Sequence, residues 1–145
     1  MSPFFQFSNP PDEQLREILS HSRTLAVVGM SNRAERASHY VSTSLQHAGY
    51  RIVPVNPNLQ EVLGTRCYPS LSEIPEPVDM VLIFRRPEFV SPVVDEAIRN
   101  KVPTVWMQVG VSHPGAARRA IEAGLQVVMD RCAWVDYQRL FGRRL

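Results

Sequence analysis

Short apolar runs alternate with segments of helical periodicity along most of the chain. Five runs have the continuous apolar character of buried parallel strands, and they cover residues 24–29, 50–55, 78–84, 104–107 and 126–129. Helical patterns precede, separate and follow these runs, at residues 12–20, 37–48, 87–100, 114–124 and 133–141. The alternation predicts a Rossmann-like, three-layer α/β/α sandwich with a mostly parallel sheet.

Capping residues and prolines in the sequence predict where the helices begin. Asp12 and Ser112 are predicted to cap the helices that follow them, and Pro87 is predicted to open its helix directly. Phe89 is expected on the apolar face of that helix. Pro54 has no N–H to donate, so it must occupy an unpaired position or lie near the end of its strand.

A proline-rich segment between the second and third long strands is predicted to be irregular. It includes a small strand at 66–68 and one helical turn at 70–74. The strand order considered for such a fold is 3-2-1-4-5-6. Strands 24–29 and 78–84 are then neighbours, and a crevice opens beyond their carboxyl ends.

Length and composition fit one domain over residues 1–145, with residues 1–11 as an irregular N-terminal arm. The formal net charge of +2 is too small to predict nucleic-acid binding. No apolar run is long enough to span a membrane and the start of the chain does not resemble a secretory signal, so we expect a cytoplasmic protein. Cys67 and Cys132 lack a metal-ligand spacing and are expected to be free thiols.

The turn after the first strand has the features of an anion site. The apolar run stops at Gly29, and a polar turn leads into a helix with Ser38 near its start. Unpaired N–H groups and the helix dipole favour a phosphate there, with Arg33 and Arg36 as cationic partners. Ser38 is expected to cap the helix or to bind phosphate.

Two further strand ends are expected beside this turn. Phe84, Arg85 and Arg86 follow the strand 78–84, and the two arginines should point in different directions because they are adjacent. Gln108 follows the strand 104–107. The sequence contains no Gly-x-Ser-x-Gly or HExxH motif, so neither a catalytic residue nor a metal site is predicted.

The end of the second strand bears on the choice of nucleotide. The GxGxxG fingerprint is missing, and Asn56 stands where NAD-binding domains usually place a carboxylate for the ribose. An amide there does not repel a phosphate on the ribose. NADP and coenzyme A both satisfy this criterion.

Several motifs in their order and spacing resemble the stand-alone CoA-binding-domain proteins, which are similar to the N-terminal domain of the succinyl-CoA synthetase alpha subunit. The resemblance covers residues 12–140 and rests on the following segments: Val28-Gly-Met-Ser-Asn with Arg36 and Ser38, Val53-Pro-Val-Asn-Pro57, Phe84-Arg-Arg-Pro87, Trp106-Met-Gln-Val-Gly110 and Met129-Asp-Arg-Cys132.

The resemblance implies a binding role for each of these segments. Gly29, Met30, Ser31 and Asn32 would wrap the diphosphate, and Arg36 and Ser38 would hold phosphate at the start of the helix. Asn56 would lie beside the adenosine, Phe84, Arg85 and Arg86 would line the opposite wall, and Gln108 and Val109 would approach the pantetheine arm.

The resulting hypothesis is a protein that binds coenzyme A or an acyl-CoA without catalysis of its own, as a carrier, a sensor or a docking module. A homo-oligomer and an acyl-CoA enzyme both stay open as partners. The first alternative is an NAD(P)-binding oxidoreductase or redox sensor. A structural interaction module with a vestigial pocket is the second.

Overall fold

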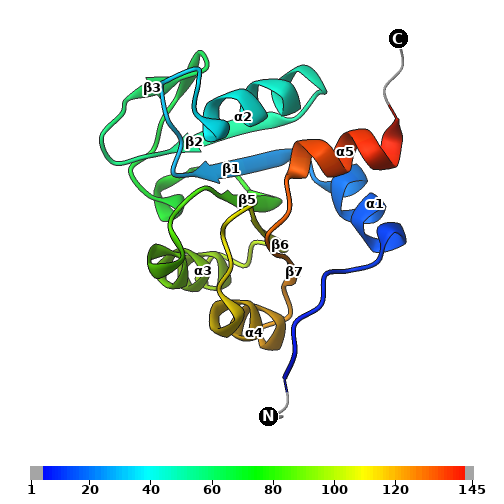
Figure 1. Cartoon of the computed structure of the whole chain (residues 1–145). Helices are drawn as coiled ribbons and strands as arrows, with labels where there is room; N and C mark the ends of the chain where they lie inside the picture. The colour runs from blue at the N-terminus through cyan, green and yellow to red at the C-terminus, as the bar shows by residue number, and fades with distance from the viewer. Residues whose placement is uncertain (1–4, 143–145) are drawn as a thin grey trace.

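A parallel five-stranded sheet forms the middle layer of the computed structural model, which describes residues 5–142 (Figure 1). Its strands lie in the order β2-β1-β5-β6-β7, and every neighbouring pair is parallel. They are β1 (Thr24–Val28), β2 (Arg51–Val55), β5 (Met80–Ile83), β6 (Thr104–Met107) and β7 (Gln126–Val128).

Helices cover both faces of this sheet (Figure 1). One face carries α1 (Asp12–His21), α2 (Ala37–His47) and α5 (Ala133–Phe141), and the other carries α3 (Val90–Arg99) and α4 (Pro114–Glu122). The predicted Rossmann-like three-layer sandwich is therefore confirmed.

Alternate residues of each strand enter different cores. In β1, Leu25 and Val27 pack with α1, α2 and α5, whereas Ala26 and Val28 pack with α3 and α4. Successive side chains of a strand point to opposite faces, so a strand covered on both sides must be apolar throughout. This explains the continuous apolar runs of the sequence.

The small third strand is reduced to a single contact. Tyr68 forms an isolated parallel bridge with Val55 at the edge of β2, and its N–H donates to the carbonyl oxygen of Pro54. The preceding residues form a separate antiparallel hairpin of β3 (Glu61–Val62) and β4 (Thr65–Arg66). The five long strands thus follow the order 3-2-1-4-5-6. At the position of the small third strand, only the bridge of Tyr68 is present. Pro54 lies in β2 beside this contact.

Four local predictions were wrong, the first being that Pro87 opens its helix directly: Pro87 begins the 3-10 turn Pro87–Phe89, and α3 begins at Val90. Asp12 is the first residue of α1, after Pro11 at the N-cap, and its carboxylate accepts a hydrogen bond from Arg139. His113 rather than Ser112 caps α4, because its Nδ1 accepts the N–H of Ala116 at 2.9 Å. Phe89 lies in a short 3-10 turn before α3, and 46% of it is exposed.

The described part of the N-terminal arm, residues 5–11, contains no helix or strand. Asn9 nevertheless ties it to the residue after β7. Its Nδ2 donates to the carbonyl oxygen of Met129 at 3.0 Å, and its Oδ1 accepts the Met129 N–H at 2.8 Å. The side chain thereby satisfies backbone groups just beyond the edge strand.

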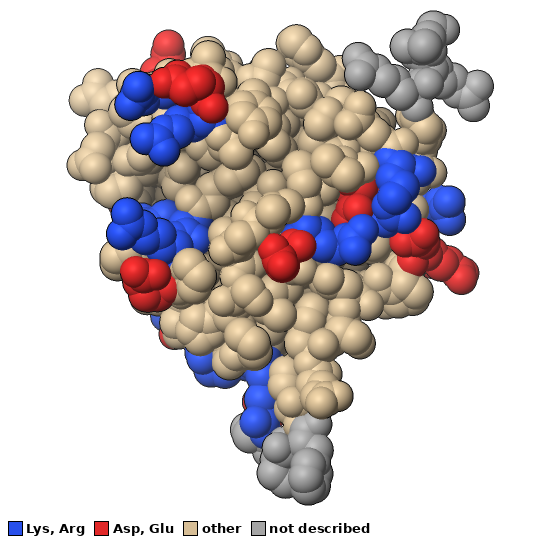
Figure 2. Space-filling model, viewed as in Figure 1, with Lys and Arg blue, Asp and Glu red and all other residues tan. Residues whose placement is uncertain are grey.

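Charged side chains of both signs are mixed on the face shown in Figure 2, where most basic groups lie near acidic ones. The buried carboxylate of Asp136 on α5 receives hydrogen bonds from Arg131 at 2.6 and 2.7 Å and from Arg139 at 3.2 Å.

None of the helices in residues 5–142 has both the length and the apolar character needed to cross a membrane.

Candidate functional site

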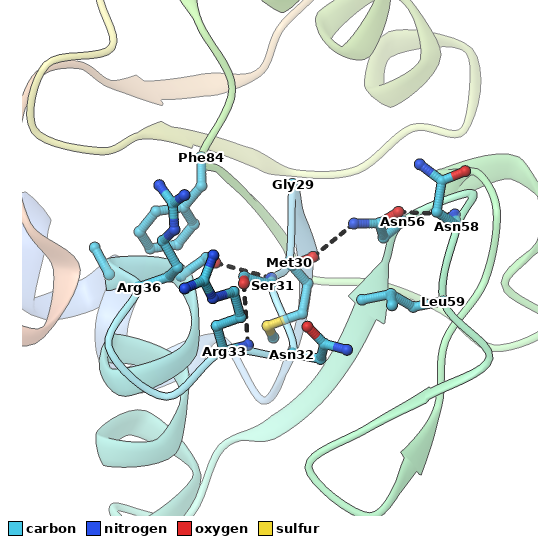
Figure 3. A pocket seen from close by; sticks show the side chains of 12 residues that line it. Gly29, Met30, Ser31, Asn32, Arg33, Arg36, Asn56, Asn58, Leu59 and Phe84 are labelled. Atoms are coloured by element: carbon cyan, nitrogen blue, oxygen red, sulfur yellow. Dashed lines mark hydrogen bonds between the residues drawn. The ribbon is translucent and has the colours of Figure 1, made fainter.

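A cavity of about 430 Å³ opens where β1 ends and α2 begins (Figure 3). We call it the α2 lobe. It is lined by Gly29, Met30, Ser31, Asn32, Arg33, Arg36, Ala37, Ser38, Asn56, Asn58, Leu59 and Phe84. Figure 3 shows the two arginines on one side of Gly29 and Met30, with Asn56, Asn58 and Leu59 on the other.

A second cavity of about 260 Å³ adjoins it at the end of β2. We call it the β2 lobe. It is lined by Gly29, Val55, Asn56, Pro57, Asn58, Phe84 and Arg85, so the two lobes share Gly29, Asn56, Asn58 and Phe84. Both lie at the carboxyl ends of β1, β2 and β5, where the strand order reverses, as the sequence predicts.

Gly29 lets the β1–α2 turn lie against the β5–α3 connection. Its φ is +88°, and a β-carbon added there would lie 2.4 Å from the carbonyl oxygen of Phe84. The glycine is required by both the backbone conformation and the close approach.

The first amides of the turn are already occupied within the protein. The N–H groups of Gly29 and Met30 both donate to the carbonyl oxygen of Val55, at 3.1 and 3.4 Å. The Ser31 N–H donates to Ser38 Oγ at 2.9 Å. Wrapping of the diphosphate by these three residues stays a prediction, and their N–H groups are not open to it in this arrangement.

Other donors remain open around the α2 lobe. Within residues 5–142, no acceptor is found for the backbone N–H groups of Asn32, Ala37 and Ser38. The hydroxyl oxygens of Ser31 and Ser38 each accept a backbone N–H, which orients them and leaves each hydroxyl proton free to donate. Ser38 thus braces the turn, while the N-cap of α2 is Arg36, without a side-chain cap.

The structure distinguishes Arg36 from Arg33. Arg33 forms a 2.9 Å ion pair with Glu35, and both side chains are largely exposed. No carboxylate among the described residues pairs with Arg36, which lines the same lobe. Arg36 therefore presents the uncompensated positive charge at the start of α2.

Asn56 joins the two sides of the cavity. Its Nδ2 donates to the carbonyl oxygen of Met30 at 2.8 Å, and its Oδ1 accepts the Asn58 N–H at 2.8 Å (Figure 3). The amide therefore fixes the turn after β2 against the turn after β1. One N–H of Nδ2 and one lone pair of Oδ1 remain for a ligand.

Of the adjacent residues Arg85 and Arg86, only Arg85 lines one of the two lobes. Arg85 lines the β2 lobe, with its guanidinium carbon 4.7 Å from the centre of the Phe89 ring. Arg86 is exposed and lines neither lobe. The pair thus supplies one cation to the cavity.

Gln108 and Val109 line neither lobe. The side chain of Gln108 is buried, and its Oε1 accepts the N–H of Ala133 at the start of α5 at 2.8 Å. Val109 is 65% exposed. Their approach to the pantetheine arm stays a prediction.

Three lining residues of the α2 lobe were missed by sequence reasoning, Ala37, Asn58 and Leu59, and two of the β2 lobe, Val55 and Pro57. Asn56-Pro57-Asn58 carries the signature of an Asx turn, which would have indicated that the Asn58 backbone is held beside Asn56. Ala37 lies at the first position of α2, where a free N–H is expected.

Groups with a shifted pKa lie outside the two lobes. Burial raises the pKa of the Cys67 thiol, which donates a weak hydrogen bond to the Asn56 carbonyl oxygen at 3.6 Å. Burial also raises the pKa of Tyr50, whose hydroxyl donates to the Leu19 carbonyl oxygen. Residues 5–142 contain no group of three or more His, Cys, Asp or Glu able to hold a metal ion.

Comparison with protein families decides the assignment. The model described as CoA binding domain matches residues 23–138, which include both lobes. The chain belongs to the CoA-binding domain family. The family resemblance inferred from the sequence motifs is therefore confirmed.

Relatives of this CoA-binding domain protein occur alone and inside larger enzymes. The uncharacterized protein YneT of Bacillus subtilis is 43% identical over 129 residues, which are 89% of this chain and 96% of YneT. The ADP-forming acetate–CoA ligase I of Archaeoglobus fulgidus is 30% identical over 116 residues, which are 79% of this chain and 17% of the ligase. A hypothetical protein from Pyrococcus horikoshii has a solved structure with a TM-score of 0.91, 37% identity, and coverage of 98% and 100% of the two chains.

Proposed function

We propose that this CoA-binding domain protein binds coenzyme A or an acyl-CoA across its two lobes. The observation that carries the proposal is that Arg36 and Arg85, neither of which is paired with a carboxylate of residues 5–142, line adjoining cavities that share Gly29. Coenzyme A carries two separate anionic groups, the diphosphate and the phosphate on its ribose. The charge distribution of the cavity complements such a ligand.

The diphosphate is assigned to the α2 lobe. Open N–H groups of Ala37 and Ser38 lie at the positive end of the α2 dipole, and the hydroxyls of Ser31 and Ser38 can donate alongside them. Arg36 adds a guanidinium that can form charge-assisted hydrogen bonds with phosphate oxygens. The open donors thus come from the start of the helix more than from the turn.

The polar side chains that line the lobes are amides, hydroxyls and guanidiniums, which are groups that bind and orient an anionic ligand. We therefore propose a role without catalysis: a carrier, a sensor or a module that docks with an acyl-CoA enzyme. The ligase relatives support the docking role, because the region matching this chain makes up 17% of the Archaeoglobus fulgidus enzyme.

Calorimetric titration with CoA, acetyl-CoA, NADPH, NADH and ATP tests the proposal. We expect both CoA forms to bind more tightly than the other nucleotides and to raise the melting temperature. No heat with either CoA form up to about millimolar concentration would overturn it. Tighter binding of NADPH than of CoA would instead support the NAD(P)-dependent alternative, and no thermal shift with any nucleotide would support the structural module.

A further inference from the structure

Arg85 is the charged side chain among the seven residues that line the β2 lobe. No acidic residue lines this lobe, and no carboxylate within residues 5–142 forms an ion pair with Arg85. Arg85 is half-buried, and an anionic partner offsets the cost of removing part of a charged side chain from water. The β2 lobe therefore favours an anion.

The rest of the lobe indicates which part of a nucleotide lies there. Val55 is the last residue of β2 and Asn56 and Pro57 follow it, and in Rossmann-type domains the adenosine ribose lies at this strand end. A carboxylate there accepts the hydroxyls of a plain ribose, whereas an arginine nearby accommodates a ribose phosphate. The β2 lobe combines an amide at the strand end with the Arg85 cation.

We infer that Arg85 selects ligands that carry a phosphate on the adenosine ribose and rejects those that do not. The inference rests on the proposed function and adds to it the ligand group that the protein recognises, which is the phosphate on the ribose. Arg36, in the α2 lobe, faces the diphosphate that all these ligands share. The two cations thus have separate tasks, one in affinity for any adenosine diphosphate ligand and one in discrimination.

Two contacts hold Arg85 in position for this task. Its guanidinium lies over the Phe89 ring, with 4.7 Å between the guanidinium carbon and the ring centre. Its Cδ lies 3.1 Å from the point where a β-carbon on Gly29 would stand, so the stem packs directly against the β1–α2 turn. Stacking leaves the edge of the guanidinium plane free to donate hydrogen bonds. Phe89, although exposed, is on this argument a positioning residue.

The test compares CoA with 3′-dephospho-CoA, which differ by the ribose phosphate alone. Affinities of both are measured by calorimetry for the full chain and for Arg85→Gln, with thermal unfolding to verify that the variant folds. We expect Arg85→Gln to weaken CoA by about ten- to one-hundredfold, the usual effect of losing hydrogen bonds to a charged group, and to leave dephospho-CoA within about twofold. Arg36→Gln is the matched control and should weaken both ligands by the same factor.

Phe89→Leu separates positioning from charge. It keeps the Arg85 cation but removes the ring beneath it, so we expect the preference for CoA over dephospho-CoA to fall by a smaller factor than in Arg85→Gln. Equal weakening of both ligands by Arg85→Gln, or no change with either, would overturn the inference while leaving the proposed function intact.

A separate experiment tests the role of Arg85 in the event that the proposed function is wrong. If the unmodified chain binds neither CoA form, adenosine 3′,5′-bisphosphate is compared with adenosine 5′-monophosphate. A preference for the bisphosphate that Arg85→Gln abolishes would sustain the role of Arg85 with a different ligand. Equal binding of the two, or binding of neither, would refute it.

Discussion

The carbonyl oxygen of Phe84 lies 2.4 Å from the place where a β-carbon on Gly29 would stand. This approach brings the turn after β1 against the chain leaving β5, and the two lobes meet at the point of contact. A residue without a side chain is therefore needed here for packing as well as for its positive φ.

Gly29→Ala should destabilise the protein and abolish CoA binding. The left-handed conformation alone costs a residue with a β-carbon about 1–2 kcal/mol, and the contact with backbone atoms of Phe84 adds to it. Gly124→Ala is the matched control, because Gly124 has a φ of +93° with nothing within 4 Å of the added carbon. Thermal unfolding and calorimetry measure the difference. Equal loss of stability in the two variants would contradict the packing role.

Asn56→Ala should lower the free energy of unfolding by about 1–3 kcal/mol. The variant loses the hydrogen bonds from Asn56 to Met30 and Asn58 and frees the turn after β2 from the turn after β1. CoA affinity should fall with stability, since both lobes include Asn56. Asn58→Ala keeps its backbone N–H and should change stability by less than about 0.5 kcal/mol. Chemical denaturation distinguishes the two, and matching midpoints would show that the Asn56 amide does not join the turns.

Gln108→Leu should destabilise the protein by about 1–3 kcal/mol, because the buried N–H of Ala133 loses its acceptor. Val109→Ala, at the exposed neighbouring position, should be within about 0.5 kcal/mol of the unmodified protein. Titration with acetyl-CoA then tests whether either residue also approaches the pantetheine arm. Unchanged stability of Gln108→Leu would mean that its bond to α5 contributes little.

Glu76 should make part of the stability depend on pH. Hydrogen bonds from Arg51, and its positive charge, lower the pKa of Glu76 in the folded protein below its ordinary value. The stabilisation is therefore fully present above the pKa of Glu76 in the unfolded chain and is lost as the pH falls through the folded pKa. Since both side chains are partly exposed, the contribution at neutral pH should be below about 1 kcal/mol and should shrink with salt.

Denaturation of the unmodified protein and of Glu76→Gln between about pH 7 and pH 3 checks this effect. The difference in unfolding free energy between them should decrease toward acid pH and vanish at the low end. Arg51→Gln should show the same trend. A difference that stays constant over this range would exclude the ion pair as its source.

The arginine pairs show where sequence patterns are sufficient and where they are not. Adjacent residues at a strand end point in different directions, and this predicted that Arg85 and Arg86 could not both face the cavity. Which one does so was decided by contacts with residues outside the dipeptide, because the Arg85 guanidinium lies over the Phe89 ring and its stem packs beside Gly29. Arg33 and Arg36 were likewise distinguished only by the structure, in which Arg33 forms an ion pair with Glu35.

The sequence by itself determined the layers, the parallel sheet and the place of the crevice, because strand and helix periodicities are local properties and the apolar runs show burial on both faces. Only the tertiary structure decided which donors remain open there. The N–H groups of Gly29 and Met30 donate hydrogen bonds to the Val55 carbonyl oxygen, and the N–H of Ser31 donates to Ser38 Oγ. The side-chain amide of Asn56 donates to the Met30 carbonyl oxygen. A hydrogen bond depends on which distant atoms the completed fold brings within about 3 Å, and no local pattern encodes that proximity.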